Sequence, residues 1–388
     1  MMRWAVSLGL LAPVMILGLS LPVLADDPTG LDSKAELGQA LFFDVNLSRN
    51  RTQACATCHD PDFAFSDPRD VPGSGRAVSL GDDGVSLGDR NTPSAAYARF
   101  APPFHRNEEG QFVGGQFWDG RATDLKEQAG GPPLNPLEMG MPDKAAVVER
   151  LRENPAYVKA FGALFRAGVL EDSEAGYAAM TESIAAFEDT PVFAPFDSKY
   201  DRFLRGEEKL SDQEELGRVL FFSQQFTNCH LCHKLASDST AARQETFSNY
   251  RYHNIGIPAN PAMRAARGDG VGISDPGLLN NPAITDPAEA GKVKVPSLRN
   301  VAVTGPYMHN GVFKDLRTTI LFYNKYNSRS VKNQTDPETG EPWGPPEVDG
   351  NLSLTELEHG PALDDKRIDA LVAFLKTLTD RRYEHLLH

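Results

Sequence analysis

The chain has 388 residues, enough for two domains of ordinary size, and its formal net charge is -14 at pH 7. This acidic balance argues against a nucleic-acid partner, because phosphate contacts require a basic face. Only four cysteines occur, and all lie in two Cys-x-x-Cys-His motifs, so none is left over for a separate disulfide.

The first 25 residues have the pattern of a secretory signal peptide. Arg3 precedes an apolar stretch over residues 5–23, and Ala25 offers a small-residue cleavage site before an acidic pair. Pro13 interrupts the stretch and no stop-transfer flank follows, so a cleaved leader over residues 1–25 is favoured over a membrane anchor. No later stretch is apolar for long enough to cross a bilayer.

An internal repeat follows the leader. Residues 37–43 (LGQALFF) match residues 216–222 (LGRVLFF), and each precedes a cysteine motif. Both segments predict an amphipathic helix. Each half also closes on apolar residues at helical spacing, Tyr177 to Phe187 in the first and Ile368 to Leu378 in the second. The repeat predicts two similar units in tandem.

The segments between these helices are rich in glycine and proline. They occupy residues 67–93, 129–143, 256–291 and 336–350, while a proline-rich junction covers residues 191–210. Strand signals are weak throughout. We therefore expect a mostly α protein with long irregular loops, in which a leader at 1–25 is followed by domains at 26–200 and 201–388.

The two cysteine motifs indicate covalent c-type haem. Two thiols three residues apart can reach the two vinyl groups of one porphyrin, and the following histidine can then ligate the iron. A zinc ribbon would place its two cysteine pairs closer in sequence, and neither zinc nor a redox Cys-x-x-Cys pair explains the histidine after both motifs. We expect one haem in each of two cytochrome c-like domains, the first bound by Cys55, Cys58 and His59, the second by Cys229, Cys232 and His233.

The sixth ligand decides what each haem does. Between Asp60 and Glu138 there is no methionine, and the one histidine, His105, is interpreted as an ordinary loop residue. Haem 1 is therefore expected to keep an open face for a small oxidant. For haem 2 the residues alone leave several ligands open: His253, Met263, Tyr307, Met308, His309, Tyr323, Tyr326 and His359.

Three further segments carry a resemblance to a known family. Residues 117–122 (FWDGRA), residues 295–301 (VPSLRNV) and Gly305-Pro306-Tyr307 resemble the bacterial dihaem cytochrome c peroxidases over essentially the whole mature chain. Peroxidases of this family usually place a methionine ligand where this chain has Tyr323. Tyrosine there is similar to the methylamine-utilisation branch, whose members complete the tryptophan tryptophylquinone cofactor of methylamine dehydrogenase.

The resemblance implies the coordination of both irons. His59 would be the proximal ligand of a high-spin haem 1, and His233 with Tyr323 would make haem 2 six-coordinate and low-spin. Trp118 would lie between the haems and couple them electronically. A tryptophan in this apolar context would also suit a buried domain seam, and the two interpretations are compatible.

On the open face of haem 1, the resemblance points to Glu138, with Gln128 and Pro132 shaping the pocket. A carboxyl there can take a proton from peroxide and return it to the leaving oxygen. The alternative for Glu138 is a solvated loop charge.

The resemblance also implies a calcium ion between the haems, held by Asn91, Thr304 and Pro306, since oxygen donors suit a hard cation. Both segments could instead be simple turns.

One residue departs from the family pattern. Relatives can have a tryptophan two residues before the first cysteine of haem 2, where it could relay an electron towards a protein substrate. This chain has Thr227 there. Threonine cannot hold a hole at accessible potentials, so the route of long-range electron transfer is left open.

The function implied by the resemblance is oxidation at a distance in the periplasm. Hydrogen peroxide, or dioxygen plus electrons, would oxidise both irons to a bis-Fe(IV) state, and tryptophans of a methylamine dehydrogenase precursor would supply the electrons. A small c-type cytochrome or a cupredoxin is a possible electron donor. Two alternatives stay open: a periplasmic dihaem cytochrome c peroxidase, and a non-catalytic carrier with two capped haems.

Overall fold

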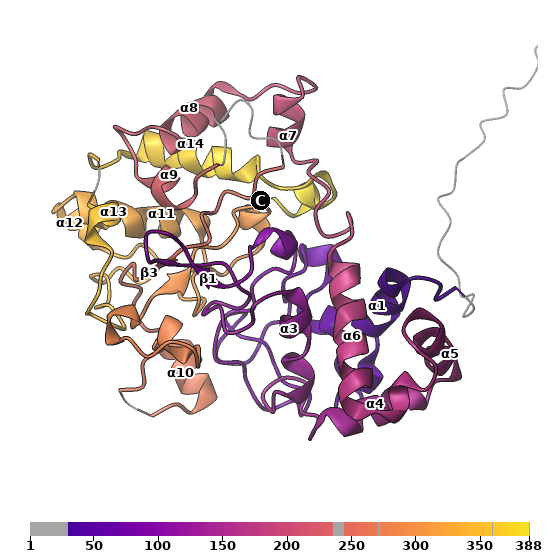
Figure 1. Cartoon of the computed structure of the whole chain (residues 1–388). Coiled ribbons are helices and arrows are strands. Elements are labelled where there is room, and N and C mark those ends of the chain that lie inside the picture. Colours follow the sequence, from indigo (N-terminus) through magenta and orange to yellow (C-terminus); the bar gives the residue numbers. More distant parts are fainter. Residues whose placement is uncertain (1–29, 236–243, 271, 359, 388) are drawn as a thin grey trace, which may run out of the picture. The chain divides into compact units, whose positions relative to one another are not determined.

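A computed structural model describes residues 30–235, 244–270, 272–358 and 360–387. The leader expected over residues 1–25 lies outside the described residues. From Leu31 onward the chain forms one compact unit that is rich in helices and has little sheet (Figure 1). This confirms the expected mostly α class.

The helices of the first half are α1 Lys34–Phe42, α2 Cys55–Cys58, α3 Leu125–Ala129, α4 Lys144–Arg152, α5 Pro155–Leu164 and α6 Ser173–Glu188. Those of the second half are α7 Lys199–Leu204, α8 Asp212–Phe221, α9 Cys229–Cys232, α10 Pro261–Arg267, α11 Leu316–Asn324, α12 Val331–Gln334, α13 Leu354–Leu357 and α14 Asp365–Lys376. Within the described ranges, no helix is long and apolar enough to cross a membrane.

Strands and 3-10 turns are short. Antiparallel pairs join β1 His105–Arg106 to β2 Phe112–Val113, and β3 Tyr252–His253 to β4 Val293–Lys294. The 3-10 turns span Val45–Leu47, Pro61–Phe63, Ala98–Phe100, Pro132–Leu134, Val169–Glu171, Leu278–Asn280, Pro287–Glu289, Val301–Val303, Lys325–Asn327 and Arg381–Leu386.

Helices α1 and α6 form the first core. Ser33 caps α1 by accepting a hydrogen bond from the Glu36 amide. The two helices touch at Gly38, where a Cβ atom would lie 1.8 Å from the Ser183 carbonyl oxygen. Phe42 and Phe187 pack edge to face with their ring centroids 5.5 Å apart. Only glycine permits this close approach of the two helices.

Helices α8 and α14 repeat the arrangement in the second core, and Figure 1 shows them side by side. A Cβ atom on Gly217 would lie 1.9 Å from the Ala370 carbonyl oxygen, and the rings of Phe221 and Phe374 are 5.3 Å apart. The predicted repeat is therefore confirmed at the level of helix packing. The closing helices are also confirmed, although α14 ends at Lys376, before the last residues of the expected helix.

The expectation of an irregular stretch over residues 256–291 was wrong for one segment, since α10 lies inside it. The Asn260 side chain caps this helix by accepting from the Met263 amide, and Pro261 occupies its first position. Gly268 ends it with a φ of 72°. These start and stop residues outweigh the high glycine and proline content of the stretch.

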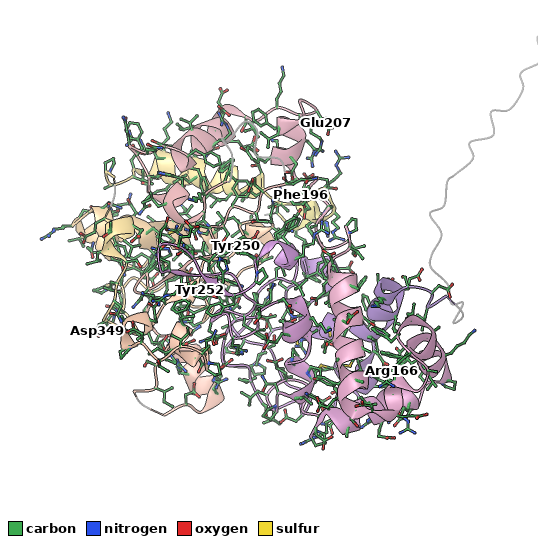
Figure 2. The ribbon with its side chains drawn as sticks, in the orientation of Figure 1. Arg166, Phe196, Glu207, Tyr250, Tyr252 and Asp349 are labelled. Carbon is green, nitrogen blue, oxygen red and sulfur yellow. The ribbon has the colours of Figure 1, made fainter. Side chains whose placement is uncertain are left out.

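A buried polar cluster joins the first core to the end of the second. The Tyr97 hydroxyl donates to the Asp380 carboxylate over 2.7 Å, and the side-chain amide of Asn300 donates to the same carboxylate over 2.9 Å. The Arg299 guanidinium lies 4.8 Å from the ring centroid of Phe196, which is labelled in Figure 2, and pairs with Asp201. We call Tyr97, Phe196, Arg299, Asn300 and Asp380 the seam cluster.

Candidate active site

Each cysteine motif folds in the same way. Helices α2 and α9 are single turns that carry the two cysteines, and the histidine follows at the helix end. The Nδ1 atom of His59 lies 3.1 Å from the Phe65 carbonyl oxygen, and that of His233 lies 2.9 Å from the Phe247 carbonyl oxygen. With Nδ1 donating to a carbonyl, each Nε2 is left to ligate a metal.

Each histidine lines its own cavity. The first cavity is bounded by Cys58, His59 and further side chains from the first half. The second is bounded by Cys229, Cys232, His233 and further side chains, most of them from the second half. None of the four cysteines forms a disulfide. Thiols, an oriented imidazole and a largely apolar cavity together fit a covalently bound haem in each place.

The wall of the first cavity holds all three residues expected on an open haem face, Gln128, Pro132 and Glu138. The Glu138 carboxylate accepts a 2.7 Å hydrogen bond from the side-chain amide of Asn135. Burial raises the pKa of the Glu138 carboxyl, against the lowering effect of this hydrogen bond and of Arg121. The side chain thus faces the cavity and is not a solvated loop charge.

Trp118 lines both cavities. Its indole nitrogen donates to the Asn91 carbonyl oxygen over 2.8 Å, and its own carbonyl accepts from the Lys294 amide over 2.9 Å. The next residue, Asp119, is fully buried and pairs with Arg90 at 2.7 Å and with Arg121 at 2.8 Å. These contacts hold the tryptophan in the walls of both cavities.

Tyr323 lies on α11 and lines the second cavity. Its hydroxyl makes no hydrogen bond to any described residue, so it is available to a ligand in the cavity. Burial raises the pKa of this phenol, which means that the protein alone favours its neutral form. A ferric iron beside it would be the cation that holds it as a phenolate.

The other ligands considered for haem 2 divide into three groups. His253, Tyr307, Met308 and His309 also line the second cavity. Met263 packs in a separate apolar cluster, and the Tyr326 hydroxyl donates to the Ile255 carbonyl oxygen. His359 lies outside the described residues. In the first half, His105 is exposed on β1 and bonds the Pro103 carbonyl, as expected of a residue without a ligand role.

The residues expected to bind calcium make different hydrogen bonds in the structure. The Asn91 side-chain nitrogen donates to the carbonyls of Arg76 and Ala77, which leaves its side-chain oxygen for a cation. The Asn91 amide donates to the His309 carbonyl oxygen, so Asn91 adjoins the segment that follows Pro306. The Thr304 hydroxyl donates to the Asn300 carbonyl over 3.2 Å, which ties the side chain to the chain before it.

Two further residues near the cavities concern the departure from the family pattern and a position that the sequence analysis missed. Thr227 is 4% exposed, and its hydroxyl donates to the Leu220 carbonyl at the end of α8, so its side chain is occupied by a structural contact. Glu188, one residue beyond the helix expected at Tyr177–Phe187, lines the first cavity and was missed. An alignment of the helices that close the two halves would have revealed Glu188, because the corresponding residue in the second half is the apolar Leu375.

Comparison with known proteins shows the family to which the chain belongs. The family model of di-haem cytochrome c peroxidases matches residues 32–209. The methylamine utilization protein MauG of Paracoccus denitrificans is 58% identical over 98% of this chain and 97% of its own length. MauG of Methylophilus methylotrophus is 32% identical over 78% of this chain and 76% of its own length.

A solved structure is similar over nearly the whole fold. The diheme peroxidase BthA of Burkholderia thailandensis has a TM-score of 0.79 at 34% identity, and the match covers 93% of this chain and 88% of that one. Both kinds of relative are enzymes, which sets aside the non-catalytic carrier. The chain therefore belongs to the family of di-haem cytochrome c peroxidases that includes MauG, and it is a haem-dependent oxidoreductase with two haems.

Proposed function

We propose that this enzyme uses hydrogen peroxide, or dioxygen plus electrons, to oxidise tryptophans of a methylamine dehydrogenase precursor and so completes tryptophan tryptophylquinone. The observation that carries the proposal is the 58% identity to Paracoccus MauG over 98% of the chain. The precursor is a protein too large to enter the first cavity, so its electrons would reach the haems at a distance. A small c-type cytochrome or a cupredoxin would be the donor when dioxygen is the oxidant.

Two haem domains, at residues 26–200 and 201–388, would divide the work. When bound, the haems supply the redox chemistry that stores the two oxidising equivalents of peroxide. His59 would hold the open haem, while His233 and Tyr323 would close the other. A phenolate donor suits an iron that must carry extra positive charge. Trp118, which lines both cavities, would conduct electrons between them.

Proton transfer in the first cavity would fall to Glu138. Its carboxyl can take the proton from one peroxide oxygen and give it to the other, which leaves as water. Gln128 and Pro132 would position the oxidant and limit the space for solvent. The Asn135 amide, which donates to Glu138 over 2.7 Å, fixes the carboxyl in place.

Calcium would be bound by the side-chain oxygen of Asn91 and the backbone oxygens of Thr304 and Pro306. The donors are hard oxygens, as calcium prefers. Residues 1–25 would direct the chain to the periplasm.

The test is quinone formation. Purified enzyme is mixed with hydrogen peroxide and immature methylamine dehydrogenase, and quinone absorbance is followed against a haem-free control. The wild-type protein should form quinone. Glu138→Gln should slow the reaction about 100-fold, since a positioned acid or base contributes at least that much. Glu149→Gln, an exposed carboxyl on α4, should leave it unchanged. No quinone above the control would refute the proposal.

A periplasmic cytochrome c peroxidase is the second candidate. The cytochrome c peroxidase Ccp of Escherichia coli is 32% identical over 72% of this chain, and the match covers 50% of the relative. Steady-state oxidation of reduced cytochrome c, much faster than any quinone formation, would favour this activity.

A further inference from the structure

Glu188 is a buried carboxyl to which the proposed reaction assigns no role. It is the last residue of α6, it is 7% exposed, and it lines the first cavity with His59 and Glu138. No described residue hydrogen-bonds to its side chain or forms an ion pair with it. A carboxyl in this state costs free energy to bury, so packing alone does not explain its presence.

The second half of the chain shows which type of residue packing alone favours at the position of Glu188. The contacts of Gly38 with Ser183 and of Gly217 with Ala370 align α6 with α14. In this alignment Phe187 corresponds to Phe374, and Glu188 corresponds to Leu375. Leu375 is also 7% exposed and lines the second cavity. The same place is therefore filled by a leucine beside one haem site and by a carboxyl beside the other.

Glu188 lies on the face of α6 that packs against α3 nearer its start, and Gln128 of α3 lines the same cavity. Tyr177, Thr181, Ile184 and Glu188 follow one another at spacings of four, three and four residues, which places them on one helical face. The part of this face that is nearer the start of α6 packs against the end of α3. The Tyr177 hydroxyl donates to the Gly130 carbonyl, and a Cβ atom on Gly130 would lie 3.4 Å from the Thr181 methyl group.

Burial keeps this carboxyl protonated near neutral pH. Desolvation raises the pKa of Glu188 to about 8, and no cation offsets the effect. Burial also raises the pKa of Glu138, but there the Asn135 side-chain amide and the nearby Arg121 partly offset the rise. The first cavity thus holds two carboxyls in different environments, an arrangement that separates proton donor from proton acceptor.

The proposed reaction needs such a donor. Reduction of peroxide consumes two protons and two electrons, H2O2 + 2 H+ + 2 e- → 2 H2O: the O–O bond breaks and two O–H bonds form. The electrons come from tryptophans of a distant protein, and the protons that those tryptophans lose are released at the distant site. Protons must therefore reach the first cavity from elsewhere, and Glu138 only moves the proton that peroxide itself brings.

We propose that Glu188 is a proton-donating residue of the first haem pocket, distinct from Glu138, which supplies a proton when electrons return to that pocket. Its carboxylic acid gives up one proton to the oxygen being reduced, is reprotonated by water, and in the same way passes on the second of the two protons that the reduction consumes. The inference rests on the proposed function, because it requires electrons and protons to arrive by separate routes.

The test uses the holoenzyme with peroxide and a small chemical reductant, so that no methylamine dehydrogenase is present. Glu188→Leu copies the residue of the second half, and Glu188→Gln keeps the shape without an acid. Glu182→Gln is the control: it removes a surface carboxyl on the same helix that pairs with Lys34 and Lys126. Infrared difference spectra report the protonated carboxyl, and stopped-flow spectra report the oxidation and re-reduction phases.

Both Glu188 variants should lose the infrared C=O band of a protonated carboxylic acid that wild type and Glu182→Gln retain. Their re-reduction phase should slow about 100-fold and lose its solvent isotope effect, while oxidation by peroxide keeps its wild-type rate. If both variants retain the band, or re-reduce as Glu182→Gln does, Glu188 is not the donor. Failure of the wild-type protein to react with peroxide would instead refute the proposed function.

Discussion

At the scale of single residues, Tyr323 combines a position in the second cavity wall with a hydroxyl that no described residue bonds. Tyr323→Phe removes the proposed ligand and keeps the ring. We expect the low-spin ferric signal of haem 2 to be replaced by a high-spin one in electron paramagnetic resonance spectra. Tyr326→Phe is the control, since that hydroxyl only donates to the Ile255 carbonyl. An unchanged low-spin signal in Tyr323→Phe would assign the ligand to another residue.

The elevated pKa of Glu188 leads to a prediction about folding stability. A carboxyl whose pKa is near 4.5 in the unfolded chain and about 8 in the folded one lowers folding stability as pH rises between these values. Glu188→Leu should remove this penalty, which by the shift amounts to roughly 5 kcal/mol above pH 8. The variant should therefore gain more in thermal unfolding temperature at pH 9 than at pH 5. An equal gain at both pH values would contradict the shift.

The sequence could place some of these residues and not others. The motif cysteines and histidines were predictable because their spacing is fixed by one porphyrin. Glu138 and Tyr323 needed the family resemblance, since a lone carboxyl or phenol carries no local signal of its partners. Tyr307 and His309 share the second cavity with Tyr323, although they come from a different segment of the chain, and only the fold brings them together.

At the scale of helices, the two glycine contacts make the most specific prediction. Gly38→Ala and Gly217→Ala would each place a methyl group within 2 Å of a carbonyl oxygen on the partner helix. We expect each to lower the free energy of unfolding by about 1–3 kcal/mol, the usual effect of overpacking. Chemical denaturation of the holoprotein measures this.

Gly162→Ala in α5 is the matched control, because nothing lies within 4 Å of its Cβ position. Alanine there should be neutral or stabilise by up to about 1 kcal/mol through helix propensity. Loss of stability in the control as large as in the other two variants would show that helix contact is not the cause.

The helix pairs were predictable from the repeat, because both halves preserve the glycine and the aromatic residues that such a contact demands. The long loops were not. Their path depends on single contacts such as Asn260 with the Met263 amide, and on bonds between residues far apart in the chain such as Asn91 with His309. Local patterns in the sequence do not predict such contacts.

At the scale of the whole molecule, the seam cluster joins residues almost 300 positions apart. Tyr97→Phe removes a buried hydroxyl that donates to Asp380 and accepts from the Phe196 amide over 3.1 Å. We expect a loss of about 1–3 kcal/mol in stability, because a buried carboxylate oxygen loses its partner. Separate denaturation curves for the high-spin and low-spin haem signals should also move apart.

Tyr157→Phe is the comparison, since that hydroxyl bonds Asp44 within the first half. It should lower stability without separating the two curves. If the curves separate equally in both variants, the seam cluster does not couple the halves.

The hydrogen bond from Trp118 to the Asn91 carbonyl has a consequence for any electron that passes through this ring. An indole that loses an electron becomes a strong acid, and it keeps its proton only when the neighbouring acceptor is too weak a base to take it. A backbone carbonyl is such an acceptor. The oxidised indole would therefore remain a cation that refills reversibly, instead of collapsing into a neutral radical that traps the charge halfway between the two irons.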